Sequence, residues 1–80
     1  MGEKFPVIKG KELLNFYIRL GSELKRIKGS HYVVKSNFNG KIFVIPIHGK
    51  EDLDRGTLRG IVYQSGLNNE EFMRLWSLKV

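Results

Sequence analysis

The sequence predicts an α+β fold, a two-layer sandwich in which helices cover one face of a three-stranded antiparallel sheet. Two observations lead to it: apolar residues at helical spacing near the N-terminus, and two alternating segments joined by an Asn-Gly pair. Two further helical patterns follow, which gives the order α-β-β-β-α-α. A chain of 80 residues has the size of one domain, so residues 1–80 are assigned to a single domain with a small core.

The first helix is predicted from Gly10, and Gly21 occupies the position at which helices often end. Its apolar stripe has the spacing of one helical face, namely Leu13, Phe16, Tyr17 and Leu20, widened by Leu14 and Ile18. The following segment, residues 22–28, is a weaker strand candidate, because Leu24 and Ile27 are out of phase with strict alternation. We therefore expect this strand either to bulge or to be short and exposed.

A hairpin is predicted next, with strands His31–Asn37 and Lys41–His48 and a two-residue turn at Asn39-Gly40. Counting outward from this turn places His31 opposite His48, about 5 Å apart at their Cβ atoms. The same count assigns alternate residues to the core face, namely Tyr32, Val34, Ser36, Phe43, Ile45 and Ile47.

Pro46 tests this register, because proline has no amide hydrogen to contribute to a sheet. The count places Pro46 opposite Val33, at a position that makes no interstrand hydrogen bond, and an edge strand tolerates proline there. The other face of the hairpin, open to solvent, then carries His31, Lys35 and His48.

Two helices are predicted after a polar loop. Thr57 is interpreted as the N-cap of a helix over Leu58–Ser65 that ends at Gly66. The buried stripe of this helix is expected to consist of Leu58, Ile61 and Val62.

The last helix begins with the pattern of a capping box, with Asn68 as the N-cap and Glu71 at the third helical position. Its aromatic residues, Phe72 and Trp76, either complete the core or form an exposed protein interface. Burial in the core is the favoured interpretation, because large aromatic side chains are usually inside.

Composition limits the possible functions. The chain has no cysteine, which excludes disulfides, thiolate metal sites and a cysteine nucleophile. A net charge of +6, with most lysine and arginine before residue 51, favours a polyanionic partner such as nucleic acid. The sequence shows neither an apolar run long enough to cross a bilayer nor the apolar segment of a signal peptide. We therefore expect a cytoplasmic protein without membrane contact.

His31 is the candidate catalytic residue, because it follows a small-residue corner, Gly29-Ser30, at the start of a strand. Histidine, with an unperturbed pKa of about 6.5, is the side chain best suited to proton transfer near neutral pH. The alternative is an ordinary surface histidine. Gly29 leaves room for a ligand backbone to approach closely. The candidate nucleic-acid-binding residues are Arg26, Lys28, Gly29, Ser30, Lys35 and Lys50.

Four motifs occur in a characteristic order: Arg26-Ile27-Lys28-Gly29-Ser30-His31, Ile45-Pro46-Ile47-His48, Gly56-Thr57-Leu58-Arg59-Gly60-Ile61 and Gln64-Ser65-Gly66-Leu67. Over about Phe5 to Phe72, the chain resembles the HicA toxins, mRNA interferases of bacterial and archaeal HicA/HicB toxin-antitoxin modules. The resemblance implies a fold like that of double-stranded-RNA-binding domains and endoribonuclease activity on mRNA. It also implies neutralisation by a HicB-type antitoxin and a catalytic role for His31. The chain departs from the family at Gly21-Ser22, where an aromatic residue usually follows the glycine, and beyond Glu71.

Cleavage of RNA without a metal needs a base for the 2′-hydroxyl, a proton donor for the leaving 5′-oxygen and cations for the phosphate. Two histidines with no carboxylate on their face offer too few ligands for a metal ion, so we expect neither a metal nor a cofactor. His31 is then the general base or acid, with Lys28 and Lys35 at the phosphate. His48 is either the complementary acid or a histidine that packs locally.

Other functions stay open at this stage. The basic face also fits a non-catalytic RNA-binding module of the same fold, or a domain that docks an acidic protein. Ile42 and Val44 add apolar surface to the open face, which fits RNA stacking, a weak homodimer or an antitoxin contact. Incubation with labelled mRNA in the presence of EDTA distinguishes these possibilities.

Overall fold

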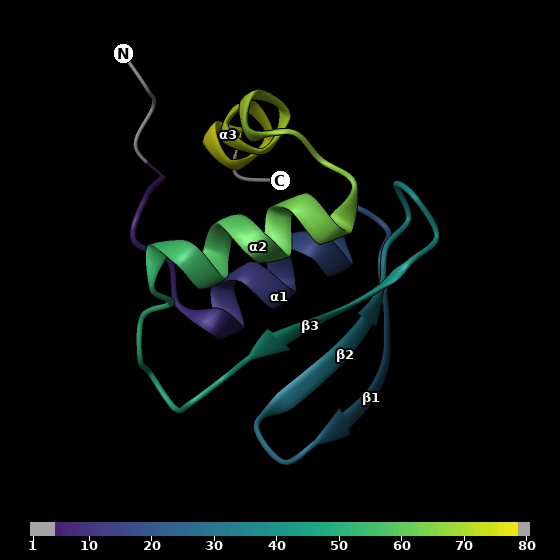
Figure 1. The fold of residues 1–80 in the computed structure, drawn as a ribbon, viewed down its shortest axis with the longest axis vertical. Coiled ribbons are helices and arrows are strands. Elements are labelled where there is room, and N and C mark those ends of the chain that lie inside the picture. The colour runs from purple at the N-terminus through teal and green to yellow at the C-terminus, as the bar shows by residue number, and fades with distance from the viewer. Residues whose placement is uncertain (1–4, 79–80) are drawn as a thin grey trace.

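The computed structural model describes residues 5–78 and has the predicted order of elements (Figure 1). One helix precedes three consecutive antiparallel strands, and two helices follow them. The elements are α1 (Gly10–Arg19), β1 (Glu23–Lys28), β2 (His31–Lys35), β3 (Ile42–Pro46), α2 (Arg55–Ser65) and α3 (Asn69–Ser77). Between Phe5 and Leu78, no helix combines the length and the hydrophobicity needed to cross a lipid bilayer.

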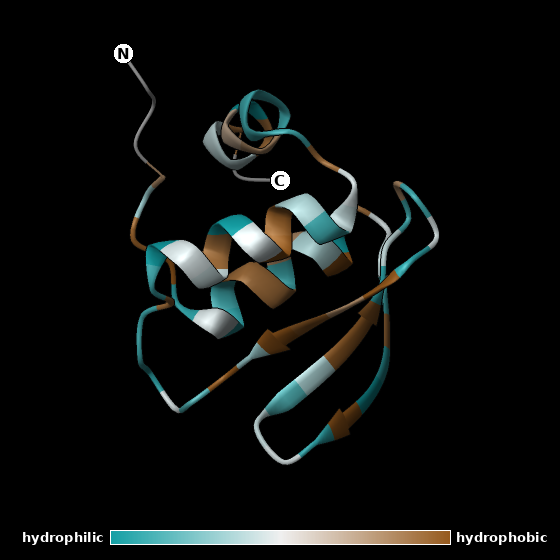
Figure 2. Ribbon diagram, in the orientation of Figure 1, coloured by the Kyte–Doolittle hydropathy of each residue, from teal (hydrophilic) through white to brown (hydrophobic). Residues whose placement is uncertain are grey.

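The helices lie on one side of the sheet. Figure 1 shows α1 and α2 next to the strands and α3 beyond them. Hydrophobic stretches run along the strands, and the helices mix hydrophobic and hydrophilic residues (Figure 2). The core between the layers contains Leu13, Phe16, Tyr17, Val34, Phe43, Ile45, Leu58, Ile61 and Val62. The predicted core face of the hairpin and the predicted stripes of both helices are therefore confirmed, except that Ile18 is 40% exposed.

The β2–β3 register differs from the prediction. His31 pairs with Pro46, and Val33 pairs with Val44, so the strands are shifted by two residues and His48 does not lie opposite His31. The turn is longer than two residues because the amide of Ser36 donates to the carbonyl of Lys41 (2.9 Å), which encloses residues 37–40 as the loop. A shift of two residues leaves each side chain on its original face.

Side chains within this loop explain the longer turn. The hydroxyl of Ser36 accepts a hydrogen bond from the amide of Phe38 at 2.9 Å. The amide of Lys41 donates to Oδ1 of Asn39, also at 2.9 Å, and therefore bonds inside the loop rather than to the opposite strand. Short polar side chains often compete with the sheet for backbone groups in this way.

Pro46 still occupies a tolerated position in the new register. The sheet order is β1-β2-β3, so β3 is an edge strand, as Pro46 requires. The next residue, Ile47, donates its amide to the carbonyl of Ser30 at 2.8 Å, so Pro46 lies between hydrogen-bonded positions. At the opposite edge, β1 has an irregularity between Leu24 and Arg26, and all six of its residues are exposed. The expected irregularity and exposure are confirmed, but β1 is not short, because its six residues exceed the five of β2 and of β3.

The cap of α2 also differs from the prediction. The N-cap is Asp54, and Thr57 lies inside the first turn, where its amide donates to Oδ2 of Asp54 (3.1 Å) and its hydroxyl to Oδ1 (2.6 Å). These bonds lower the pKa of Asp54. Aspartate is preferred to threonine as an N-cap, and its negative charge also suits the helix dipole. The helix ends as expected at Gly66, which has a φ of 94°.

The last helix packs on its own chain. Asn68 and Glu71 form the predicted capping box, with reciprocal bonds of 2.8 and 3.0 Å. Phe72 is fully buried, and its ring lies 5.4 Å from that of Phe5 and 5.2 Å from that of Phe16, between ring centroids. The core interpretation of Phe72 is therefore confirmed.

A buried polar contact joins the two inner helices to the hairpin loop. The hydroxyls of Tyr17 and Ser65 are 2.7 Å apart, and the hydroxyl of Ser36 donates to the carbonyl of Ser65. Because all three hydroxyls belong to buried residues, these bonds are needed to offset the cost of removing them from water. Burial raises the pKa of Tyr17 to about 12, against the smaller opposing effect of its bond to Ser65.

Candidate active site

His31 is the first residue of β2 and directly follows a two-residue turn. Lys28, the last residue of β1, pairs with His31 across this turn, and Gly29-Ser30 form its tip. Gly29 has a φ of 61°, a left-handed conformation that a side chain would strain, and a Cβ there would meet no atom within 4 Å. Glycine is therefore required by the backbone of the turn rather than by crowding within the protein.

Three rows of residues cross the open face of the sheet. The first row holds Lys28, His31 and Pro46, the second Arg26, Val33 and Val44, and the third Glu23, Lys35 and Ile42. Residues two apart in a strand share a face, so the pairing places Arg26, Lys28 and Lys35 on the same face as His31. All four of these side chains are exposed.

The unneutralised positive charge on this face is concentrated at the end that carries His31. The acidic residue of the face, Glu23, belongs to the opposite row and forms an ion pair with Lys25 at 3.5 Å. The other ion pair in the described part of the chain joins Lys9 to Asp52. Within residues 5–78, Arg26 and Lys28 therefore have no acidic partner that would neutralise them before an anion arrives.

His48 and Lys50 lie outside the sheet, contrary to the predicted pairing of the two histidines. Both are exposed residues of the loop after β3, where the amide of Glu51 donates to the carbonyl of His48 at 3.0 Å. The backbone of this segment stays near the first hairpin, because Ile47 bonds to Ser30. The structure therefore brings Lys28, Gly29, Ser30 and His31 together, and it places His48 in the loop after β3, one residue beyond the bond between Ile47 and Ser30, rather than opposite His31.

A comparison with known protein families identifies the family to which this chain belongs. Residues 10–67 match the family model described as the HicA toxin of bacterial toxin-antitoxin systems. The chain belongs to the HicA toxin family. The matched region runs from the start of α1 to the residue after the C-cap of α2, and it includes every predicted site residue.

One relative of this chain carries a more specific name than the family does. The chain is 41% identical over 49 residues to a protein of Pseudomonas fluorescens (strain Pf0-1) named "Probable mRNA interferase HicA". The aligned region makes up 61% of this chain and 78% of that protein. In this HicA-family chain, α3 lies beyond the part that matches the family model.

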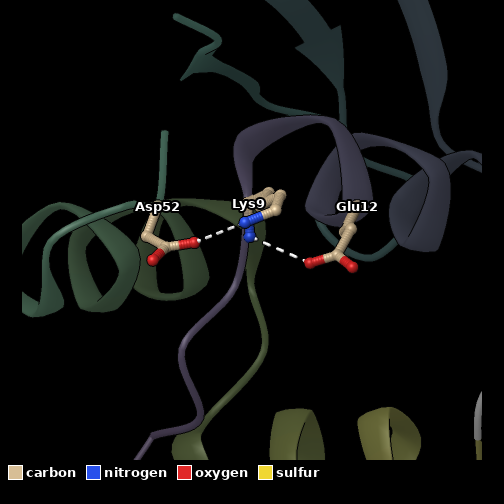
Figure 3. A network of polar contacts seen from close by, with 3 residues as sticks. All are labelled: Lys9, Glu12 and Asp52. Carbon is tan, nitrogen blue, oxygen red and sulfur yellow. Dashed lines mark hydrogen bonds and ion pairs between the residues drawn. The ribbon is translucent and has the colours of Figure 1, made fainter. Parts of the chain in front are cut away.

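The loop that follows the site of this HicA chain is tethered to the N-terminal segment. Figure 3 shows Lys9 between two acids: its Nζ donates to Oδ1 of Asp52 at 3.0 Å, and its backbone amide donates to Oε1 of Glu12 at 3.0 Å. The amide of Leu53 also donates to the carbonyl of Ile8 at 2.8 Å. The sequence carries no local signal for this contact, because Lys9 and Asp52 are 43 positions apart.

Gly10 is a second positioning residue that sequence reasoning did not find. A Cβ at Gly10 would lie 2.6 Å from the carbonyl oxygen of Pro46, which is closer than atoms can approach without movement. The start of α1 therefore packs directly on the end of β3, next to the row that holds His31. Nothing in the neighbouring sequence identifies Pro46 as the residue on which Gly10 packs, because the two are far apart in the chain.

Among residues 5–78, no three His, Cys, Asp or Glu side chains lie close enough together to hold a metal ion. The charged side chains nearest His31 in the strand pairing are the ammonium of Lys28 and the guanidinium of Arg26, both of which suit an anionic ligand. This arrangement can bind a phosphate and transfer a proton next to it.

Proposed function

We propose that this chain is the toxin of a toxin-antitoxin pair and a metal-independent endoribonuclease that cleaves mRNA through His31. The observation that carries the proposal is the exposed Lys28–His31 pair at a sharp turn on an uncovered basic face. Membership of the HicA toxin family and the name of the relative, an mRNA interferase, support the choice of mRNA as substrate.

The reaction uses the RNA's own 2′-hydroxyl. His31 takes the proton from that hydroxyl, and the 2′-oxygen attacks the adjacent phosphorus. The bond between phosphorus and the 5′-oxygen breaks, which leaves a 2′,3′-cyclic phosphate on one fragment. The departing 5′-oxygen takes up a proton, either from the imidazolium formed in the first step or from water, and becomes a hydroxyl on the other fragment.

The cations divide into two groups by their distance from His31. Lys28 is the direct cross-strand neighbour of His31, so its ammonium can neutralise the phosphate that gains charge in the transition state. Lys35 is four residues further along β2, or about 13 Å at the usual rise per residue. Arg26 and Lys35 lie in the second and third rows, on the same side of His31, so we assign both to binding of the RNA strand on one side of the cleaved bond.

The Gly29-Ser30 turn leaves the site open to an RNA backbone. Gly29 presents no side chain, and even a Cβ placed there would meet only open space, so an RNA backbone can approach Lys28 and His31 without obstruction. Ser30 supplies a half-buried hydroxyl at the same corner. Lys50 follows in the next loop and extends the positive surface beyond β3.

The test is cleavage of end-labelled mRNA by the purified protein in EDTA. We expect fragments that end in a 2′,3′-cyclic phosphate, and no cleavage at a position where the mapped nucleotide is replaced by its 2′-deoxy form. Activity that requires added metal, or cleavage that tolerates the 2′-deoxy substitution, would contradict the mechanism. Salt-dependent binding without any product would favour the non-catalytic RNA-binding module.

The antitoxin relationship has its own test. We propose that a HicB-type protein neutralises this toxin, since the HicA family is one of toxin-antitoxin systems. Expression of the chain alone in bacteria should arrest growth, and co-expression of an acidic HicB-type partner should restore it. Growth arrest that the partner does not relieve would leave the nuclease assignment intact and remove the proposed partner.

A further inference from the structure

An open groove of about 710 Å³ lies at the far end of β3 from His31. Its walls come from the start of β3, the end of α2 and the start of α3, and its lining includes Lys41, Ile42, Tyr63 and Gln64. The proposed chemistry at His31 assigns no role to these four residues. The volume is in the range of sites that bind small organic groups.

Tyr63 is the most unusual residue of the groove. It is 83% exposed, although a tyrosine on a helix of a small protein usually covers part of the core. Ile42, 52% exposed, lines the same groove. An exposed aromatic ring beside an aliphatic wall forms a surface on which a flat, uncharged ring can stack.

The wall beneath Tyr63 is held rigidly. The side-chain amide of Asn39 donates to the carbonyl of Gln64 at 3.1 Å and accepts from the amide of Lys41 at 2.9 Å. A Cβ at Gly66 would lie 2.9 Å from Nδ2 of Asn39, so the end of α2 packs closely on the hairpin loop. The groove is therefore formed before any ligand arrives, which lowers the cost of binding.

The charges in the groove favour a base over a phosphate as its occupant. Lys41 has no ion-pair partner within residues 5–78, but Glu71 also lines the groove and would repel a phosphate placed at its centre. A neutral base avoids that repulsion, and the phosphate attached to it can then contact Lys41. The side-chain amide of Gln64 is available to bond to the edge of a base.

The groove is continuous with the face that carries His31. Ile42 belongs to both surfaces, because it lines the groove and pairs with Lys35 in the third row of the open face. Four residues of strand separate this row from the row of His31, or about 13 Å. An RNA strand with one phosphate at His31 can span that distance with about four stacked nucleotides or fewer extended ones.

From this juxtaposition we propose that the groove is a nucleobase subsite, in which Tyr63 stacks on a base of the RNA a few nucleotides from the cleaved bond. The inference rests on the proposed ribonuclease function and deepens it, because it names where the substrate is recognised. Lys35 and Lys41 hold the intervening backbone.

The first test measures binding of a short fluorescent single-stranded RNA by anisotropy, in the uncleaving His31→Ala background. Tyr63→Ala should weaken binding about 5- to 150-fold, whereas Tyr63→Phe, which keeps the ring, should bind as the parent does. Ile18→Ala, an exposed apolar residue on α1, is the matched control and should have no effect. Equal affinity of the Tyr63→Ala and parent proteins would overturn the proposal.

The second test identifies the base. A series of RNAs, each with one abasic position, is compared on the parent protein and on the Tyr63→Ala variant. If Tyr63 stacks on a base, one abasic position should weaken binding to the parent but not to the Tyr63→Ala variant, so the two losses are not additive. Additive losses at every position would overturn the subsite.

The outcomes also distinguish the nucleobase subsite from the proposed nuclease function and from a protein-docking surface. If the wild-type protein binds RNA with this non-additive pattern but yields no product, the nuclease function fails and the subsite stands. If RNA binding is unchanged by Tyr63→Ala while binding of a HicB-type antitoxin is weakened, the groove is a protein-docking surface and the subsite is wrong. If the protein binds no RNA at all, both proposals fail.

Discussion

The two faces of the sheet use the same strands for opposite purposes. On the covered face, Val34, Phe43 and Ile45 are at most 1% exposed and pack beneath α1 and α2. On the open face, their neighbours along the strands, including Lys35 and Val44, face solvent. Successive residues of each strand therefore alternate between the covered face, which stabilises the fold, and the open face, which carries the proposed site. Substitutions on the open face should change activity without unfolding the protein, and those on the covered face should do the reverse.

The covered face also shows why β1 differs from its neighbours. The helices pack mainly on β3, and α1 contacts β1 less extensively than β3, so even Leu24 and Ile27 remain exposed. A strand without cover contributes little to the core but leaves its basic side chains accessible to a ligand. This is the edge that supplies Arg26 and Lys28 to the site.

The largest expected effect is on the open face. We predict that His31→Ala lowers the rate of RNA cleavage by about 10²- to 10⁴-fold, the usual contribution of a general acid or base. Its melting temperature should stay close to that of the parent, because His31 is exposed and anchors no core contact. Cleavage kinetics and circular dichroism on the same preparation check both statements. A folded variant that cleaves at the parent rate would remove His31 from the mechanism.

The matching prediction for the covered face concerns Phe43, which is 1% exposed and whose ring lies 4.8 Å from that of Tyr17. Phe43→Ala should lower the free energy of unfolding by about 3–5 kcal/mol. Val44→Ala, one residue along and facing solvent, should cost less than about 1 kcal/mol. Urea denaturation of the two variants tests the comparison directly. Similar losses at both positions would show that the open face is covered in solution.

The buried hydroxyl of Tyr17 predicts how stability changes at high pH. Burial raises its pKa from 10.0 to about 12, so the folded state holds this proton more tightly than the unfolded state. The resulting stabilisation is complete below pH 10 and is lost as the pH rises through 12, on the order of 3 kcal/mol in all. Unfolding followed between pH 9 and 12 should show this loss in the parent.

Tyr17→Phe is the variant that isolates this effect. It should be less stable at pH 7 by about 1 kcal/mol, because the bond to Ser65 is lost, and its stability should fall less steeply above pH 10. Tyr63→Phe, at an exposed tyrosine, should keep the alkaline dependence of the parent. If all three proteins lose stability equally above pH 10, the titration of Tyr17 does not control it.

Much of the fold could be predicted because it depends on local patterns. The alternation of apolar residues assigned the two faces of the hairpin correctly, even though the register was wrong by two residues, since that shift preserves the faces. The register itself depended on Ser36 and Asn39, whose side chains bond to the loop and lengthen the turn. Asp54 and Thr57 can both cap a helix, and the prediction of Thr57 as the N-cap of α2 was wrong.

The candidate site, like the fold, was predictable where it depends on residues that are adjacent in the sequence. Lys28, Gly29, Ser30 and His31 are adjacent in sequence, so their proximity followed from one hairpin turn. The tether between Lys9 and Asp52 and the groove at Tyr63 come from segments far apart in the chain, and no local pattern indicates which segments meet. The predicted pairing of His31 with His48 was wrong because it depended on the β2–β3 register, which differs from the prediction by two residues.

The smallest expected effect therefore concerns His48. In the observed register Pro46 occupies the place opposite His31, and His48 is an exposed loop residue beyond the end of β3. His48→Ala should change the cleavage rate by less than about threefold, against the roughly 10²-fold or more expected for a residue that transfers a proton in the transition state. The cleavage rate of His48→Ala is compared with that of His31→Ala under the same conditions. A loss at His48 as large as that at His31 would mean that RNA binding moves the loop and that two histidines share the reaction.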